Sequence, residues 1–218
     1  MIRQKILLVV FDLDGVLLNS KENMKISWNL VNRKYHLKIN FSNYFKNIGI
    51  PFFHILKKLK IKQKTKTYYK KIKFTYDTTS KNDSVSLNLY KGSKTFLKRL
   101  KDKNIKTCIL TSKDIFRSKV FLKKFDIKVN KLITPEKIKF PKPHPFALNQ
   151  LKKIYRIHYS NILFIGDTIH DYKCAKSAKV NYAHVNWGYG KNYKPKIKIN
   201  NFLDLNKYFI FYYFCILI

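Results

Sequence analysis

This sequence of 218 residues has few cysteines, few acidic residues and no long apolar run. Its three cysteines, Cys108, Cys174 and Cys215, lack metal-binding spacing, which argues against a disulfide framework and favours a reducing, cytoplasmic location. The apolar run of residues 6–11 is shorter than the roughly 7–15 residues of a secretory signal core, so we interpret it as a buried strand. The apolar run of residues 208–218 falls short of the about 20 residues of a membrane-spanning helix.

Acidic residues are scarce: the chain has 12 of them and 46 basic residues, so its formal net charge is +34. Clustered positive charge attracts nucleic acids and anionic membranes. The lysines are nevertheless spread over the whole chain, and only five basic residues are arginine, the better phosphate ligand. We therefore interpret the charge as a compositional bias and expect no specific nucleic-acid partner. A basic binding protein associated with nucleic acid remains an alternative.

Apolar residues make up 45% of the chain, enough for a sizeable core. Continuous apolar runs that end in polar residues are typical of strands buried in a parallel sheet, and helical patterns separate them here. Asp114 is a candidate helix cap, with Phe116, Val120 and Phe121 facing the core. This alternation predicts an α/β fold with a doubly wound, Rossmann-like parallel sheet. The expected strands are residues 5–11, 105–111 and 161–166, and the expected helices are residues 93–103, 114–125 and 146–155.

Residues 16–90 break this alternation. Trp28, Val31 and Tyr35 have helical spacing, and Pro51 can open another helix, whereas no buried strand is evident. We therefore predict an α/β core of residues 1–15 and 91–207, an inserted, mainly helical lobe of residues 16–90, and a hydrophobic tail of residues 208–218.

Polar residues follow each of the three expected strands. In an open parallel sheet, ligands bind beyond the carboxyl ends of the strands, so these residues are expected to converge. Taken singly, Asp14 with Gly15 could form a turn and Asp167 could cap a helix. Gathered carboxylates require a compensating cation, and an all-oxygen set suits magnesium. The converging residues are Asp12, Asp14, Thr111, Ser112 and Asp167, with Asp171 one helical turn further on.

Four segments resemble, in order and spacing, the motifs of the haloacid dehalogenase-like (HAD) hydrolases. The insertion of residues 16–90 resembles the C1 cap of that family. A further segment, Asn186 to Gly190, resembles a loop of the phosphoglycolate phosphatase branch. The four motif segments are Phe11 to Ser20, Ile109 to Lys113, Lys142-Pro143 and Phe164 to Asp171.

The resemblance implies phosphoryl transfer through a covalent aspartyl-phosphate. It implies that Asp12 is the nucleophile and Asp14 the general acid and base. Thr111, Ser112 and Lys142 then bind the phosphoryl group. The implied ligands of Mg²⁺ are the Asp12 carboxylate, the Asp14 main-chain carbonyl, Asp167 and Asp171.

Asp14 also separates subclasses, because the dehalogenase branch lacks a carboxylate two residues after its nucleophile. The resemblance therefore favours a Mg²⁺-dependent phosphatase of a small phosphorylated metabolite, similar to phosphoglycolate phosphatase. The turn of residues 49–51 resembles a cap loop that reaches the active site, although a plain helix start explains it equally well. A phosphosugar mutase of the β-phosphoglucomutase kind remains an alternative.

Overall fold

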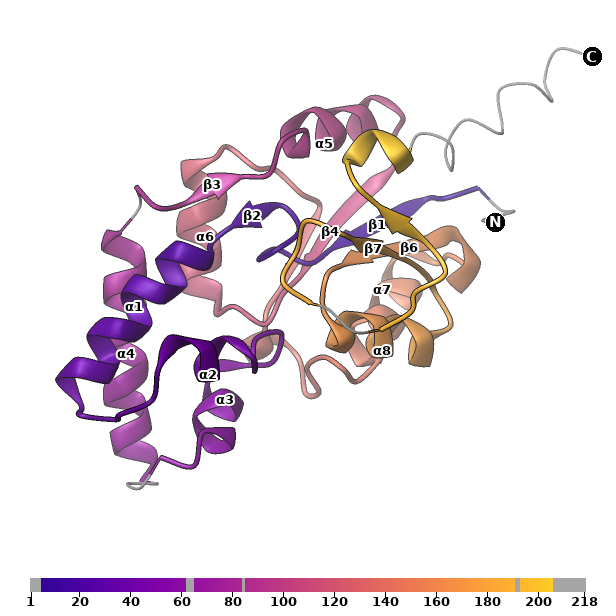
Figure 1. Ribbon diagram of the computed structural model, residues 1–218. Coiled ribbons are helices and arrows are strands. Elements are labelled where there is room, and N and C mark those ends of the chain that lie inside the picture. Colours follow the sequence, from indigo (N-terminus) through magenta and orange to yellow (C-terminus); the bar gives the residue numbers. More distant parts are fainter. Residues whose placement is uncertain (1–4, 62–64, 84, 191–192, 206–218) are drawn as a thin grey trace, which may run out of the picture.

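The computed structural model describes residues 5–61, 65–83, 85–190 and 193–205. Its centre is a sheet of six strands in the order β5-β4-β1-β6-β7-β8, and all neighbouring strands are parallel (Figure 1). All four residues of β1 are apolar and buried, which suits an inner strand covered on both faces. The strands are β1 (Leu8–Phe11), β4 (Lys106–Leu110), β5 (Lys131–Ile133), β6 (Ile162–Gly166), β7 (Asn181–Val185) and β8 (Lys198–Ile199).

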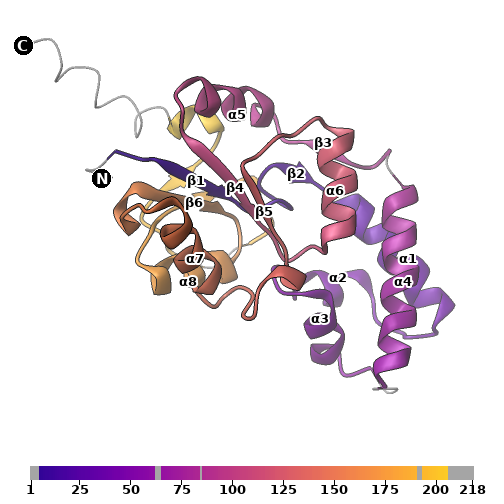
Figure 2. The same ribbon diagram turned by 180° about the vertical axis from the view of Figure 1, so that it is seen from behind.

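Helices cover both faces of this sheet. Because successive side chains of a strand alternate, Val9 and Phe11 pack into one apolar cluster and Leu8 and Val10 into another. The first cluster includes residues of α5 and α6, and the second includes residues of α7 and α8. Figure 2 shows β5 and β4 from behind. The doubly wound α/β fold is confirmed, with α5 (Ser93–Asp102), α6 (Ile115–Lys124), α7 (Phe146–Tyr155) and α8 (Ile169–Ala178).

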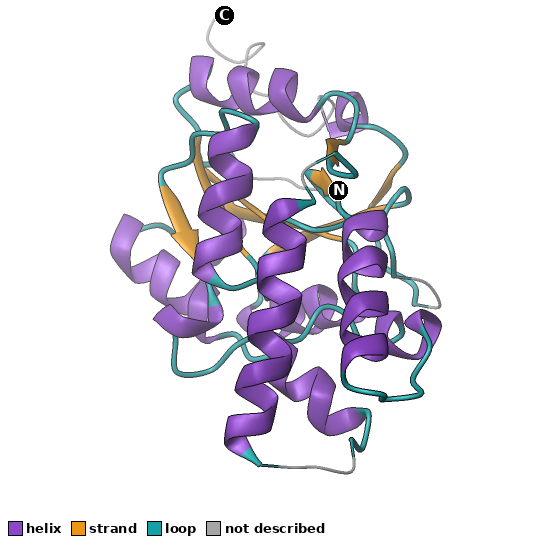
Figure 3. Cartoon of the chain, turned by 90° about the vertical axis from the view of Figure 1, so that its left-hand side faces the viewer, coloured by secondary structure: helices purple, strands orange, loops and turns teal. Residues whose placement is uncertain are grey.

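A mainly helical lobe lies beside the carboxyl ends of the strands (Figure 3). It has its own apolar cluster, in which Trp28 stacks on Tyr44 with ring centroids 4.4 Å apart. A two-stranded antiparallel ribbon, β2 (Leu18–Asn19) with β3 (Asn88–Leu89), joins it to the core, and the sequence pattern did not reveal this ribbon. The lobe helices are α1 (Lys21–Lys34), α2 (Phe41–Phe45), α3 (Phe52–Lys58) and α4 (Lys66–Asn82).

The predicted cap of α6 is present, since the Asp114 side chain accepts a hydrogen bond from the Arg117 amide. The prediction that Phe116 faces the core is wrong, because this side chain is 52% exposed. The register set by the cap turns Phe121 inward, and Lys81 lies over the Phe116 ring at 5.1 Å from its centroid. Within the described ranges, no helix combines the length and apolarity that crossing a membrane requires. Residues 208–218, predicted to form a tail, lie outside the described ranges.

Candidate active site

Asp12 and Thr111 are each the first residue beyond an inner strand. The Asp12 amide still bonds the Ile165 carbonyl of β6, at 2.9 Å, and the Thr111 amide bonds the Ile133 carbonyl of β5, at 3.0 Å. These last bonds of the sheet fix both residues at its carboxyl edge. Asp12 and Thr111 are buried, and both line a cavity between the sheet and the lobe.

Three buried carboxylates gather at this edge. One oxygen from each of Asp12, Asp167 and Asp171 lies within 4.8 Å of the others, and we call these residues the carboxylate cluster. Asp167 directly follows β6, and Asp171 enters from the first turn of α8, where it forms a capping box with Thr168. The predicted convergence of these three acids is therefore seen in the structure.

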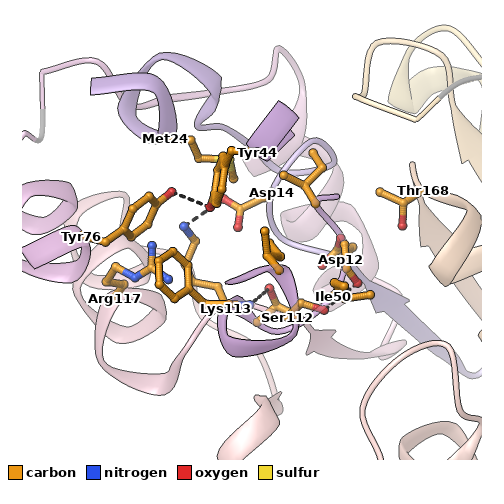
Figure 4. Close-up of a pocket in the computed structure, with 15 residues that line it drawn as sticks. Asp12, Asp14, Met24, Tyr44, Ile50, Tyr76, Ser112, Lys113, Arg117 and Thr168 are labelled. Atoms are coloured by element: carbon orange, nitrogen blue, oxygen red, sulfur yellow. Dashed lines mark hydrogen bonds and ion pairs between the residues drawn. The ribbon is translucent and has the colours of Figure 1, made fainter. Parts of the chain in front are cut away.

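Asp14 does not join this cluster through its side chain. Its Oδ1 instead lies 3.2 Å from the Lys113 ammonium and accepts a 2.5 Å hydrogen bond from the Ser20 hydroxyl. The Asp14 side chain is thus directed toward the lobe side of the site, and it lines the cavity with Asp12 (Figure 4). The two acids of the first motif segment face different surroundings.

Lys142 is the cation that contacts the carboxylate cluster. Its Nζ lies 2.6 Å from Asp171 Oδ1 and 3.0 Å from Asp12 Oδ1. Burial lowers the pKa of Lys142, but Asp12 and Asp171 outweigh this effect and hold the pKa above its usual value. Lys142 therefore stays charged while it touches the proposed nucleophile.

The three carboxylates outnumber Lys142, and the pKa values of two of them are raised. Burial raises the pKa of Asp12 to about 7, with contributions from Asp171 and Asp14 that Lys142 only partly offsets. Burial, Asp171 and Asp12 together hold the pKa of Asp167 well above its usual range. Charged carboxylates packed this closely need a further cation beside Lys142.

Asp167 offers an oxygen for such a cation. Its Oδ2 accepts a 2.7 Å hydrogen bond from the Tyr189 amide, whereas its buried Oδ1 has no hydrogen-bond partner among the described residues. Buried polar atoms are nearly always satisfied, so this oxygen is a candidate ligand atom. The all-oxygen donor set fits a hard divalent cation such as Mg²⁺.

Two glycines allow the surrounding loops to pack against Asp167. Gly15 has a φ of +82°, and a Cβ there would lie 2.2 Å from Asp167 Oδ2. A Cβ at Gly188 would lie 2.2 Å from the Asp167 Cβ. The segment of residues 186–190, which resembles a loop of the phosphoglycolate phosphatase branch, therefore packs directly against Asp167.

Thr111 and Ser112 have defined hydrogen-bond roles. The Thr111 hydroxyl accepts a 3.1 Å bond from the Lys113 amide, which leaves its own proton available to a ligand. The Ser112 hydroxyl donates to the Gly49 carbonyl at 2.8 Å. That bond ties the loop of residues 49–51 to the core, and Gly49 and Ile50 line the cavity.

The lobe closes the cavity with apolar and aromatic side chains (Figure 4). The volume of this cavity is about 50 Å³. The Tyr44 hydroxyl donates to the Tyr76 hydroxyl at 2.9 Å, and Arg117 lies over the Tyr76 ring at 4.9 Å from the centroid. The lobe residues that line the cavity are Met24, Tyr44, Ile48, Gly49, Ile50, Phe52, Ile55 and Tyr76.

Arg117 belongs to a second group of charges, of which Arg117 and Asp114 are buried and Asp77 and Lys73 are half-buried. Its Nε lies 2.5 Å from Asp114 Oδ2 and 3.1 Å from Asp77 Oδ1, and Lys73 also pairs with Asp77. We call Arg117, Asp114, Asp77 and Lys73 the arginine cluster. Because Asp77 and Lys73 lie in α4, this cluster connects the lobe to α6 of the core.

The structure thus brings all seven candidate site residues to one edge of the sheet. Sequence reasoning missed Lys113, Ser20 and Arg117, which also lie there. Lys113 directly follows the Thr111-Ser112 pair, and this proximity was an available signal. Arg117 and Asp77 are 40 positions apart on different elements, and no pattern in the sequence connects them.

Comparisons with known proteins agree with this geometry. A family model described as haloacid dehalogenase-like hydrolase matches residues 9–185. The pyrophosphatase PpaX of Oceanobacillus iheyensis is 24% identical over 204 residues, which cover 90% of this chain and 94% of that protein. PpaX of Bacillus cereus is 25% identical over 208 residues, covering 90% and 93%.

Solved structures share the fold. A predicted phosphoglycolate phosphatase from Haemophilus somnus 129pt superposes with a TM-score of 0.85 at 24% identity, covering 94% of this chain and 99% of that one. A mutant of CbbY from Rhodobacter sphaeroides, in complex with xylulose-(1,5)bisphosphate, gives 0.81 at 12% identity, covering 92% and 96%.

Proposed function

The chain belongs to the haloacid dehalogenase-like hydrolases, as its four motif segments had indicated, and we propose that it is a Mg²⁺-dependent phosphatase of small phosphomonoesters. The observation that carries this proposal is the carboxylate cluster, with Lys142 against Asp12 and an unpartnered buried oxygen on Asp167. The proposed ligands are the Asp12 carboxylate, the Asp14 main-chain carbonyl, Asp167 and Asp171. When bound there, Mg²⁺ supplies positive charge that lets an anionic ester approach carboxylates.

Asp12 is the proposed nucleophile. Its carboxylate oxygen attacks phosphorus, and the bond from phosphorus to the leaving oxygen breaks, so a covalent aspartyl-phosphate forms. Lys142 holds Asp12 in place and carries a positive charge beside the transferred group. The Thr111 hydroxyl and the Ser112 amide are the proposed donors to the phosphoryl oxygens.

Asp14 is the proposed general acid and base. It gives a proton to the leaving oxygen in the first step and takes one from water in the second. Its position supports this role, because its side chain lines the cavity and lies outside the carboxylate cluster.

The lining of the cavity bears on the choice of leaving group. Its lobe side is mostly apolar and aromatic, whereas a phosphosugar carries several hydroxyl groups that need hydrogen-bond partners. The lining therefore favours a small phosphorylated metabolite, as in phosphoglycolate phosphatases, over the phosphosugar of a mutase.

The cysteines bear on the compartment. Cys108 and Cys174 are buried and unpaired, which supports the reducing, cytoplasmic location that we propose for this enzyme.

Phosphate release tests the proposal. The wild type and Asp12→Asn are assayed with and without Mg²⁺ on 2-phosphoglycolate, pyrophosphate, sugar phosphates and nucleoside monophosphates. The expected result is Mg²⁺-dependent release from a small substrate, abolished by the substitution. Equal release by both proteins would refute the mechanism. Conversion of a sugar 1-phosphate to its isomer without phosphate release would establish the mutase instead.

A further inference from the structure

Lys113 is a buried lysine in a chain whose lysines are mostly at the surface. Its side chain is 1% exposed, and its Nζ lies 3.2 Å from Asp14 Oδ1 and 4.8 Å from the centroid of the Phe121 ring. An ammonium group is retained in such a place only when a charge partner compensates for the lost hydration. Asp14 is the carboxylate that the structure places against Lys113 Nζ.

Ser20 contacts the same oxygen of Asp14. It occupies the N-cap position of α1, where a serine hydroxyl ordinarily accepts a bond from its own helix, but the structure shows no such side-chain bond. The hydroxyl donates to Asp14 Oδ1 at 2.5 Å instead, and the Ser20 amide bonds the Tyr189 hydroxyl at 2.8 Å. Among the described residues, the Lys113 ammonium and the Ser20 hydroxyl therefore both contact Oδ1 of Asp14.

We propose that Lys113 is a positioning residue that holds Asp14 by Oδ1 and so presents Oδ2 to the reacting oxygen atoms. This inference rests on the phosphatase function proposed above. In the first step, the proton on Oδ2 passes to the leaving oxygen as its bond to phosphorus breaks. In the second, water gives a proton to Oδ2 while its oxygen bonds phosphorus and the bond between Asp12 and phosphorus breaks.

The backbone of Lys113 serves the same arrangement. Its amide donates to the Thr111 hydroxyl at 3.1 Å, so that the hydroxyl proton is free for a phosphoryl oxygen. One residue thus organises the acid and base on one side and a phosphate donor on the other. The competing role for Lys113 is direct contact with an anionic leaving group, because its side chain also lines the cavity.

The test compares leaving groups in Lys113→Met. Ethyl phosphate and 2-phosphoglycolate release alkoxides that need a proton, and only the second leaving group carries an extra charge. Acetyl phosphate releases acetate, which leaves without being protonated. The readouts are kcat, KM and the acid-quenched phosphoenzyme per active site. The control is Lys119→Met, at an exposed position of α6, the helix that follows Lys113 in the chain.

For both alkyl esters, kcat is expected to fall about 100-fold, the range for losing general acid or base assistance, with little change in KM. With acetyl phosphate the first step persists, but the second lacks its base, so phosphoenzyme accumulates to nearly one per active site. In an Asp14→Asn background, Lys113→Met is expected to have little further effect, because both changes disable the same group. Lys119→Met behaves as the wild type.

Several outcomes would overturn the proposal. A raised KM for 2-phosphoglycolate alone would assign Lys113 to the leaving group, and wild-type kinetics would leave it without a role. Independent losses in the double variant would show that Lys113 does not act through Asp14. Lys113→Gln repeats the series if Lys113→Met does not fold, and failure of both to fold would assign the contact to stability. Activity retained in Asp12→Asn would refute the proposed function itself, a result separate from any of these.

Discussion

The carboxylate cluster and the arginine cluster both bury several charges at the boundary between sheet and lobe, but they balance them differently. In the carboxylate cluster, three acids face Lys142, and the pKa of Asp12 and that of Asp167 are raised. In the arginine cluster, two acids face two cations. Burial still raises the pKa of Asp77, but for Asp114 the effect of Arg117 and Lys73 outweighs that of burial and holds the pKa well below its usual range.

This difference separates a site from a structural connection. Removing one partner from a matched pair of buried charges destabilises the fold, whereas unmatched buried charges are typical of sites where a ligand compensates for them. The carboxylate cluster is therefore expected to govern activity, and the arginine cluster the stability of the contact between lobe and core. Four predictions test this contrast, from the largest expected effect to the smallest.

Asp12→Asn is expected to reduce turnover by at least about 10⁴-fold, as the loss of a covalent nucleophile does. Without metal, its unfolding temperature should equal or exceed that of the wild type, because the substitution removes one of the crowded negative charges. Phosphate release and metal-free thermal unfolding measure the two effects. A marked loss of stability would contradict the assignment of this residue to activity rather than to the fold.

Arg117→Met is expected to lower the free energy of unfolding by about 3–5 kcal/mol, because it removes the main partner of the buried Asp114 and one partner of the half-buried Asp77. Urea unfolding measures this change, with the exposed Lys119→Met as the control. An unfolding free energy within experimental error of the wild type would show that the arginine cluster contributes no net stability.

Mg²⁺ is expected to stabilise the wild type against unfolding by about 2.7 kcal/mol at a concentration 100 times its Kd, because it binds the folded state and not the unfolded state. Asp167→Asn should remove most of this gain, because it replaces the unpartnered carboxylate oxygen. Arg117→Met should keep the gain. Thermal unfolding at increasing Mg²⁺ distinguishes them, and an equal gain in all three proteins would place the metal elsewhere.

Asp12 of the carboxylate cluster and Asp114 of the arginine cluster are expected to give opposite pH dependence. In the metal-free protein, Asp12 takes up a proton near pH 7 when folded but only near its ordinary value of 3.8 when unfolded, so stability falls as pH rises from about 4 to 7. The pKa of Asp114 is lowered in the folded state. The stability that Asp114 contributes is therefore present above pH 3.8 and is lost as the pH falls below that value.

Urea unfolding across this pH range, with and without Mg²⁺, measures both slopes. Bound Mg²⁺ should abolish the fall between pH 4 and 7, because it matches the carboxylates, and should leave the acid limb unchanged. A metal-free stability that rises steadily from pH 4 to 7 would contradict the raised pKa of Asp12.

The sheet was predictable where burial leaves a continuous apolar signal. The runs that became β1, β4 and β6 are inner strands, and their apolar residues identified them directly. β5 was missed because it has only three residues and begins at the exposed Lys131. β7 was missed because Asn181 and His184 interrupt its apolar pattern, although His184 is buried.

The site was predictable from topology and from its resemblance to known motifs, but its supporting residues were not. The ends of parallel strands meet at one edge, so Asp12, Thr111 and Asp167 could be brought together without knowing any side-chain direction. The position of Lys113 next to Thr111 and Ser112 could have drawn attention to it, but its contact with Asp14 depends on where its side chain points, which the sequence does not show. Ser20 appeared in the sequence only as the end of the first motif segment, and the structure alone shows that it precedes α1 and that its hydroxyl donates to Asp14.

The most direct test of the account is the identity of the phosphorylated residue. The wild type is mixed with acetyl phosphate and Mg²⁺, quenched in acid, digested and examined by mass spectrometry. We expect the mass of one phosphoryl group on the peptide that contains Asp12, located on Asp12 itself and missing in Asp12→Asn. Phosphate release in the absence of any such adduct, or an adduct on another residue, would contradict the assignment of Asp12 as the nucleophile.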